Sequence, residues 1–482
     1  MSIARLAAAL LAGAALSAAA GPARAEERLY WGVTLLDPAT ETATENAWIV
    51  VVDGKVRRVG RGRPPRSIPA ERRHDFRGRF LIPGLIDTHA HVTLGPVSVR
   101  AVDGAPRLAA AWDPAIVAFN GRMLLAWGVT TIRDPGGDTA RTVAYARDER
   151  AGRVQGPEAV VAGLILDRAR LPFDGLVHDV TTGGPIAEIV RRQAEAGVDY
   201  VKLYASLNEE DLAQAIAAAR TNRVRTIGHL EGVSWTRAAD LGIDSLVHMV
   251  PVHPDLLPPD RRDSYSRTTR HGSFSFFEWY EAVDLDGPEI REMIATLKAR
   301  KVHLDATLIA FHLTFWGDDP VVRDADLAEA PPALVANWQG GFRFDAGWKP
   351  ADYARAKAVW PKVLRLTRML HEAGVPMTIG TDMANPFIAP GASLSREMKL
   401  HADAGVPNWA ILRMATSDAA RVLGLGDRTG RLRPGYEADA VFLDADPRRD
   451  ILAVRRVAAV LDDGELLDPE TLRREARSAV SP

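Results

Sequence analysis

From residue 85 onward, short apolar segments alternate with longer segments of helical periodicity. Strands that alternate with helices predict a parallel sheet, and eight such units suit a (β/α)8 barrel. The predicted strands are residues 85–91, 129–133, 159–165, 199–204, 223–229, 243–248, 302–309 and 376–382. The predicted helices between them include residues 185–196, 208–221, 288–300 and 353–372. We therefore expect an α/β protein built on a TIM barrel, with its site at the carboxyl ends of the strands.

Segments with the pattern of short strands occupy both ends of the chain. Residues 29–82 contain several β-rich runs, and Asp53-Gly54 between two of them is a hairpin signal. Residues 430–461 return to the same pattern. We expect residues 26–83 and 425–482 to form one small β-sandwich beside a barrel of residues 84–424. The tail from Arg473 is polar, and we expect it to be loosely held.

The first 25 residues have the pattern of a secretory signal peptide. Arg5 supplies a basic start, residues 6–20 form an Ala/Leu-rich run, and Ala23-Arg24-Ala25 is a cleavage signal. The run is too short and too rich in alanine for a membrane anchor. We expect cleavage after residue 25 and a periplasmic or secreted protein that has no membrane attachment once the signal is removed.

The composition restricts the chemistry of any site. There are no cysteines, so disulfides, thiolate metal ligands and thiol nucleophiles are excluded. The 60 basic and 62 acidic residues give a net charge of −2, so the chain has no excess positive charge to attract nucleic acid or anionic lipid. A metal ion would have to be held by histidine, carboxylate or a modified side chain.

Polar side chains gather at the carboxyl ends of five predicted strands. They are His89 and His91 on the first strand, Lys202 on the fourth, His229 on the fifth, His248 on the sixth and Asp382 on the eighth. These ends meet at the mouth of a barrel, so the group predicts a metal centre there. Taken singly, each residue is more often structural, and Lys202 could be a surface lysine with an apolar stem. As a carbamate formed with CO₂, Lys202 would instead supply an anion able to bridge two cations.

These motifs resemble those of the metal-dependent amidohydrolase superfamily, and within it the imidazolonepropionase-like and prolidase-like branch. The matching stretches are Pro83-Gly-Leu-Ile-Asp-Thr-His-Ala-His91, Asp199-Tyr-Val-Lys-Leu-Tyr204, Gly380-Thr-Asp382, Ala415-Thr-Ser-Asp-Ala-Ala-Arg-Val-Leu-Gly-Leu425 and Gly430-Arg-Leu-Arg-Pro-Gly-Tyr-Glu-Ala-Asp-Ala440. The resemblance covers nearly the whole mature chain and implies two divalent metal ions, usually Zn²⁺. The ligands it implies are His89, His91 and Asp382 for the first ion, His229 and His248 for the second, and carboxylated Lys202 as the bridge.

Two departures from the superfamily pattern leave the substrate open. They are Val247 before His248 and Leu230-Glu231 after His229. Nitrogen and oxygen ligands suit Zn²⁺, and they also accept Mn²⁺ or Co²⁺.

The resemblance and the charge of such a centre predict hydrolysis of a C–N bond in a peptide-like or cyclic amide. Two cations lower the pKa of a bridging water enough to supply hydroxide, and Asp382 would pass the proton to the leaving nitrogen. Tyr204 shares a strand face with Lys202 and could contact the tetrahedral intermediate. The same site could hydrolyse an ester, a lactone or an organophosphate, and a non-catalytic barrel scaffold is the alternative outside enzymes. We expect a small-molecule or dipeptide-like substrate and no nucleic-acid partner. The sequence does not decide whether the protein forms a homo-oligomer.

Two aromatic regions follow the sixth and seventh strands, at residues 274–280 and 338–344, and the second also contains glycines. They either cover the mouth and set substrate choice or pack against a subunit partner. Arg133 and Arg168 are candidates for gripping a substrate carboxylate. His253, His271 and His312 could also reach the mouth.

Overall fold

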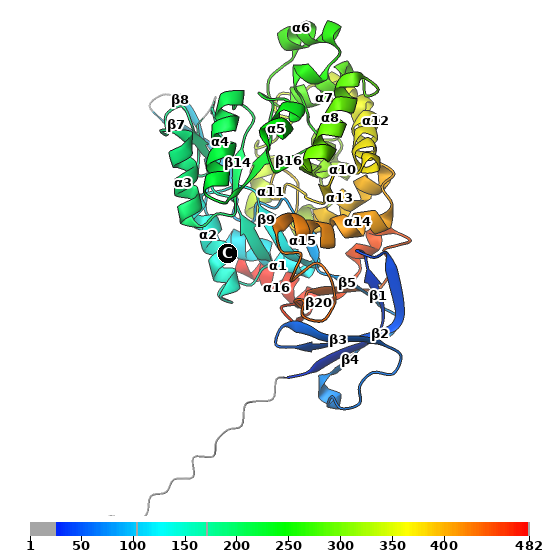
Figure 1. Cartoon of the computed structure of the whole chain (residues 1–482). Coiled ribbons are helices and arrows are strands. Elements are labelled where there is room, and N and C mark those ends of the chain that lie inside the picture. The colour runs from blue at the N-terminus through cyan, green and yellow to red at the C-terminus, as the bar shows by residue number, and fades with distance from the viewer. Residues whose placement is uncertain (1–25, 103–104, 170–171, 481–482) are drawn as a thin grey trace, which may run out of the picture.

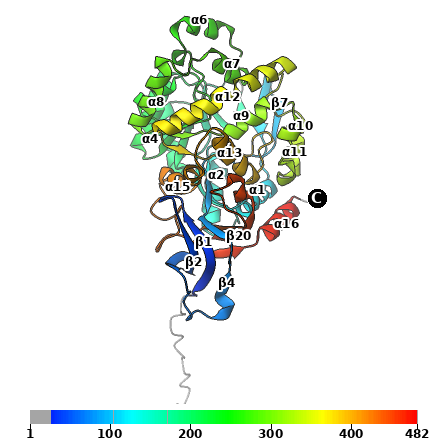
Figure 2. The same ribbon diagram turned by 90° about the vertical axis from the view of Figure 1, so that its right-hand side faces the viewer.

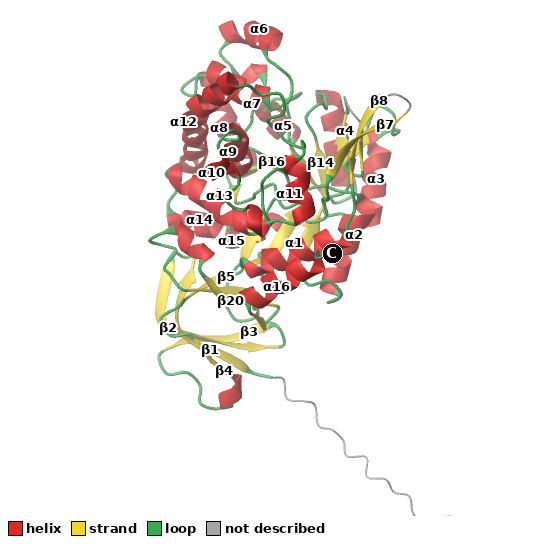
Figure 3. Ribbon diagram, turned by 180° about the vertical axis from the view of Figure 1, so that it is seen from behind, coloured by secondary structure: helices red, strands yellow, loops and turns green. Residues whose placement is uncertain are grey.

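Eight parallel strands form the centre of the computed structural model, which describes residues 26–102, 105–169 and 172–480. They are β6 (Leu85–Asp87), β9 (Val129–Asp134), β10 (Glu158–Val161), β14 (Tyr200–Leu203), β15 (Arg225–Gly228), β16 (Ser245–Val247), β17 (His303–Asp305) and β18 (Met377–Thr378). Parallel ladders run through β6, β9 and β10, and again from β14 to β18. Figure 3 shows these strands surrounded by helices.

Backbone contacts close the two ladders into a ring. On one side, Ala162 bridges to Tyr200 and the Asp199 N–H donates to the Val161 carbonyl at 2.8 Å. On the other side, the Thr88 N–H donates to the Ile379 carbonyl at 2.9 Å, and Ala90 bridges to Met383. The predicted (β/α)8 barrel is therefore confirmed.

Helices cover the barrel, and several begin and end where capping chemistry predicts. Those around the strands are α1 (Pro114–Ala126), α2 (Thr139–Arg150), α3 (Ile186–Ala196), α4 (Glu209–Thr221), α5 (Trp235–Leu241), α8 (Pro288–Arg300), α12 (Pro350–Ala373), α13 (Ala392–Asp403), α14 (Asn408–Met414) and α15 (Ser417–Leu423). Asn208 and Asp211 form a capping box at the start of α4. Gly197 and Gly374 end α3 and α12 in the left-handed conformation. Their apolar faces join the strands in one large core.

A second, smaller unit is made of strands from both ends of the chain (Figure 1). Its strands are β1 (Arg28–Asp37), β2 (Thr42–Val52), β3 (Lys55–Arg61), β4 (Arg73–Asp75), β5 (Phe80–Pro83), β19 (Ala440–Leu443), β20 (Val457–Asp462) and β21 (Glu465–Leu467). They form one hydrogen-bonded sheet in the order β21-β20-β19-β5-β1-β2-β3, with β4 pairing β1. Residues of the two chain ends, such as Ile49 and Phe442, share one core. We call this unit the β domain.

Further elements stand beyond the carboxyl ends of the barrel strands. Strands β7 (Val97–Val102), β8 (Ala105–Ala110) and β12 (Phe173–Asp174) form a small sheet, and β11 (Ile165–Asp167) with β13 (Val177–Asp179) extends the ladder at β14. The connections after β16 and β17 contain α6 (Pro259–Thr268), α7 (Phe274–Ala282), α9 (Leu308–Phe315), α10 (Pro320–Arg323) and α11 (Pro332–Gln339). Among the described helices, none is both long enough and apolar enough to cross a membrane.

Two local predictions were wrong. The tail from Arg473 is not loose, because residues of α16 (Pro469–Ala479) pack against α1 through Leu472 and Ala476 (Figure 2). Residues 302–309 are not one strand, because β17 ends at Asp305 and α9 begins at Leu308. The predicted signal peptide lies outside the described residues.

Candidate metal centre and active site

His89, His91 and Asp382 converge at the mouth of the barrel. The two histidines directly follow β6, and Asp382 lies beyond β18 with a left-handed φ of 69°. Atoms Nε2 of His89 and Nε2 of His91 each lie 3.3 Å from Oδ1 of Asp382. The three side chains are buried, and their potential ligand atoms lie within 4.8 Å of one another. This spacing fits three ligands of one ion.

Outer hydrogen bonds orient the two imidazoles. Nδ1 of His91 donates to the Gly136 carbonyl at 2.8 Å, and Nδ1 of His89 lies 3.1 Å from Oδ2 of Asp305. Because Nδ1 is engaged in each ring, Nε2 carries the lone pair that faces Asp382. Burial lowers the pKa of His89, which favours the neutral ring that a metal requires.

His229 and His248 form a second pair beside the first. They follow β15 and β16, and their ring centroids are 4.7 Å apart, while His248 lies 4.9 Å from His89. Nδ1 of His248 contacts Oγ1 of Thr307 at 2.6 Å. Burial lowers the pKa of His248 well below its ordinary value. Within the described residues, neither ring nitrogen of His229 has a hydrogen-bond partner. Oε1 of Glu231 lies 3.4 Å from Nε2 of His229. A buried imidazole without a hydrogen bond, beside a second imidazole, is suited to binding a metal ion.

Lys202 is buried on β14 at the floor of the same cavity. Burial lowers the pKa of its ammonium to about 7, although the nearby Asp382 carboxylate acts in the opposite direction and raises it. A substantial neutral fraction of the amine near neutral pH is the form that reacts with CO₂. The donor set as a whole contains nitrogen and oxygen only, so the residues present fit two divalent ions of the zinc type.

One cavity of about 410 Å³ is lined by all six predicted ligands and by Tyr204. The Tyr204 ring centroid lies 4.7 Å from that of His229. Burial raises the pKa of Tyr204, so its phenol stays protonated and can donate a hydrogen bond. Both aromatic regions after β16 and β17 also contribute, through Phe276 and residues 342–344.

The other polar candidates are placed elsewhere. Arg133 is fully buried inside the barrel, where it donates to the Thr88 carbonyl at 2.8 Å and to Asp305 at 3.2 Å. Arg168 is paired with Asp211. Neither arginine is among the described residues that line the cavity, nor are the other histidine candidates His253, His271 and His312.

Sequence reasoning missed the outer partners Asp305 and Thr307. The available signal for Asp305 was a carboxylate within the seventh predicted strand, where it stands at the carboxyl end of β17.

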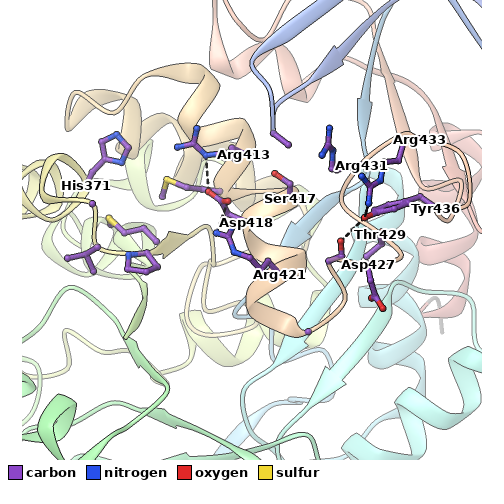
Figure 4. A pocket seen from close by; sticks show the side chains of 18 residues that line it. His371, Arg413, Ser417, Asp418, Arg421, Asp427, Thr429, Arg431, Arg433 and Tyr436 are labelled. Atoms are coloured by element: carbon purple, nitrogen blue, oxygen red, sulfur yellow. Dashed lines mark hydrogen bonds and ion pairs between the residues drawn. The ribbon is translucent and has the colours of Figure 1, made fainter. Parts of the chain in front are cut away.

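A larger cavity, of about 850 Å³, lies at the start of β18 and is not the candidate site (Figure 4). Its arginines already have partners. Arg413 and Arg421 pair with Asp418 at 2.9 Å each, and Arg431 pairs with Asp37 at 2.6 Å. None of the six predicted ligands is among its described lining residues, so we assign it no chemistry.

Comparisons with known proteins show the same fold and identify the family. Imidazolonepropionase from Cereibacter sphaeroides (strain ATCC 17029 / ATH 2.4.9) is 27% identical over 415 residues, which cover 83% of this chain and 89% of the relative. The structure of a putative prolidase from Bifidobacterium longum is 23% identical, with a TM-score of 0.65 over 94% of this chain and 99% of the other. A bottromycin amidohydrolase is 24% identical, with a TM-score of 0.67 over 95% of this chain and 91% of the other. The amidohydrolase family model matches residues 80–467, and the chain therefore belongs to the amidohydrolase family.

Proposed function

We propose that the protein is an exported amidohydrolase that uses two metal ions to hydrolyse a peptide-like or cyclic amide. Membership of the family makes it a hydrolase of carbon–nitrogen bonds. The observation that carries the finer proposal is the convergence of six donor side chains, from five barrel strands, on one buried cavity. Export is supported by the pattern of residues 1–25, which lie outside the described part of the chain.

The donors divide naturally between two ions. His89, His91 and Asp382 would hold the first ion, and His229 with His248 would hold the second. Lys202, as a carbamate, would supply the anion between them. When bound, such a pair of ions supplies an activated water and polarises the substrate carbonyl.

The protein's own groups would manage the proton and orient the substrate. Asp382 lines the cavity, so its carboxylate could take a proton and pass it to the leaving nitrogen. Asn385 donates to Oδ1 of Asp382 at 2.8 Å and fixes that carboxylate. The Tyr204 phenol would donate to the oxygen that gains negative charge.

The activities named for the similar proteins favour amides over the alternatives. An imidazolonepropionase, a putative prolidase and a bottromycin amidohydrolase are among the proteins that this chain resembles. The second candidate is hydrolysis of an ester, a lactone or an organophosphate at the same site. The activated water could attack an ester carbonyl or a phosphorus atom as well as an amide carbonyl.

The test is a substrate panel with the zinc-loaded protein. Dipeptides, cyclic dipeptides, N-acyl amino acids, lactones and aryl esters are compared by kcat/KM, and metal content is measured in parallel. We expect about two ions per chain and the highest kcat/KM on an amide. A lactone or ester preferred over every amide would overturn the proposal.

Removal of the metal or of its ligands gives the complementary test. Chelation should abolish turnover, and His89→Ala or Asp382→Ala should lower it by several orders of magnitude together with metal content, while the barrel stays folded. His371→Ala, on α12 and outside the active-site cavity, is the matched control.

A further inference from the structure

We infer that the active site selects an amide whose acyl arm is uncharged and apolar, held by an aromatic wall that begins at the metal-ligand histidines. The inference rests on the proposed function and names the class of substrate within it. It assigns Phe276 and Phe311 as specificity-determining residues.

The wall is formed by two rings from two different helices. Phe276 lies on α7 and Phe311 on α9, and their ring centroids are 5.2 Å apart in an edge-to-face arrangement. Phe276 lies 6.5 Å from the His229 ring, and Phe311 lies 6.1 Å from the His248 ring. An apolar group of the substrate that packs on these rings would lie next to the reacting carbonyl. Burial of this group there could lower the free energy of the transition state.

A second apolar surface of the cavity comes from the small sheet beyond the barrel. Leu108 on β8 pairs in register with Phe173 on β12, and both side chains line the cavity. Leu176 and Ile165 add to the lining. The cavity therefore offers apolar contacts from the β7-β8-β12 sheet as well as from α7 and α9, which suits an arm of aromatic size.

Charge in the cavity argues against an obligatory substrate carboxylate. Among the described lining residues, Lys202 and Arg343 are the lysine and arginine side chains. Lys202 lies at the floor among the proposed ligands. Arg343 is held by both oxygens of Asp345 and donates to the Gly317 carbonyl at 3.0 Å. Its charge is thus neutralised by Asp345, and its Nε and Nη2 donors are engaged.

Apart from the proposed ligand Asp382, the remaining carboxylate of the described lining has the wrong sign to bind a substrate carboxylate. Glu231, whose Oε1 lies 3.4 Å from Nε2 of His229, also lines the cavity. An anionic arm near Glu231 would meet repulsion, whereas an apolar arm on the two phenylalanines would not.

The experiment uses a matched substrate series with the zinc-loaded protein. The N-acetyl, N-hexanoyl and N-phenylacetyl derivatives of alanine are prepared as free acids and as N-methylamides, and release of the acyl acid is measured. We expect kcat/KM to rise about tenfold or more from acetyl to phenylacetyl. We also expect the N-methylamides to be cleaved at least as well as the free acids. A strong preference for the free acid, or indifference to the acyl arm, would overturn the inference.

Variants of the wall identify the residues responsible. Phe276→Ala and Phe311→Ala should each reduce the phenylacetyl-to-acetyl ratio, and Phe276→Leu and Phe311→Leu serve if the alanine variants fold poorly. Phe274→Ala is the matched control, because Phe274 lies on the same helix but packs against Trp348 and Arg270 outside the cavity. It should leave the ratio unchanged, and an equal effect of all three alanine variants would contradict the assignment.

Equilibrium binding separates the inference from the proposed function. If no amide in the series is hydrolysed, the proposed function is wrong for these compounds, and calorimetry on the N-methylamides still decides the inference. Tighter binding of the phenylacetyl than of the acetyl compound, lost in Phe311→Ala, supports an apolar subsite. Equal binding of the two rejects it.

Discussion

Lys202 is the residue whose chemistry distinguishes this site from an ordinary histidine cluster. If it bridges two ions as a carbamate, the required property is a bidentate anion. We therefore expect Lys202→Arg to be as damaging to kcat/KM as Lys202→Ala, because a guanidinium offers donors and no lone pair. In Lys202→Ala, added formate, acetate or propionate should restore part of the rate and of the metal content.

If Lys202 had only a structural role, the variants would rank in the opposite order of activity. It would tolerate arginine and would not respond to carboxylates. An active Lys202→Arg protein with normal metal content would end the carbamate proposal.

The gathering of the six donor side chains at one cavity was predictable from the sequence, because five of them follow recognisable strand segments and Lys202 lies on another. The hydrogen-bond partners of these donor side chains were harder to predict. Asp305 and Thr307 lie in a run that has the composition of a strand, and only the fold brings them to His89 and His248. Arg133 illustrates the same limit, since its burial inside the barrel could not be told from a position at the mouth.

At the scale of elements, α13 supports the mouth through a buried carboxylate. Glu397 on α13 accepts the Leu308 N–H at 3.0 Å and the Ile309 N–H at 2.6 Å, at the start of α9. His401, one turn later, lies 3.0 Å from the same carboxylate. Thr307, which directly precedes α9 with a φ of 44°, contacts His248. Glu397 thus acts as a positioning residue for one proposed ligand.

We expect Glu397→Gln to weaken one metal site as well as the fold. The amide nitrogen cannot accept a backbone N–H, which leaves a buried donor unsatisfied at a cost of about 1–3 kcal/mol. Affinity for the second ion, measured by metal titration, should fall about 10- to 100-fold, as for other outer partners of ligands. Asp403→Asn, at the exposed end of the same helix, is the control. A lower Tm with unchanged metal affinity would limit Glu397 to a structural role.

Element boundaries differ from the sequence prediction for identifiable reasons. The predicted runs continue past the strands into the mouth, where the left-handed His248 directly follows β16 and the left-handed Asp382 lies four residues beyond β18. The tail helix α16 was missed because its composition is polar. Its signals were present, namely the Asp468 cap and the spacing of Leu472 and Ala476 on one face.

At the scale of the whole molecule, the barrel meets the β domain across a cluster of buried and half-buried carboxyl groups. Glu149 lies on α2, Asp462 on β20 and Asp439 just before β19. Burial, together with neighbouring carboxylates, raises the pKa of Glu149 to about 8 and that of Asp439 to about 7. Burial also raises the pKa of Asp462 well above its ordinary value. These residues are far apart in the sequence, so no local pattern could have grouped them.

This cluster makes stability fall as pH rises. An unfolded aspartate titrates near pH 3.9, whereas folded Asp439 titrates at about 7. Between these values the folded state holds a proton that the unfolded chain has lost, so the free energy of unfolding decreases with rising pH. We expect Asp439→Asn, which can still bond Thr429 and the Asp463 N–H, to raise Tm at pH 8 by about 2 °C or more. Its Tm should also fall less between pH 5 and pH 8 than that of the native protein. Asp263→Asn removes an exposed carboxylate and is the control, whose Tm should fall with rising pH as steeply as that of the native protein. If the Tm of Asp439→Asn fell equally steeply with pH, the role assigned to Asp439 would be contradicted.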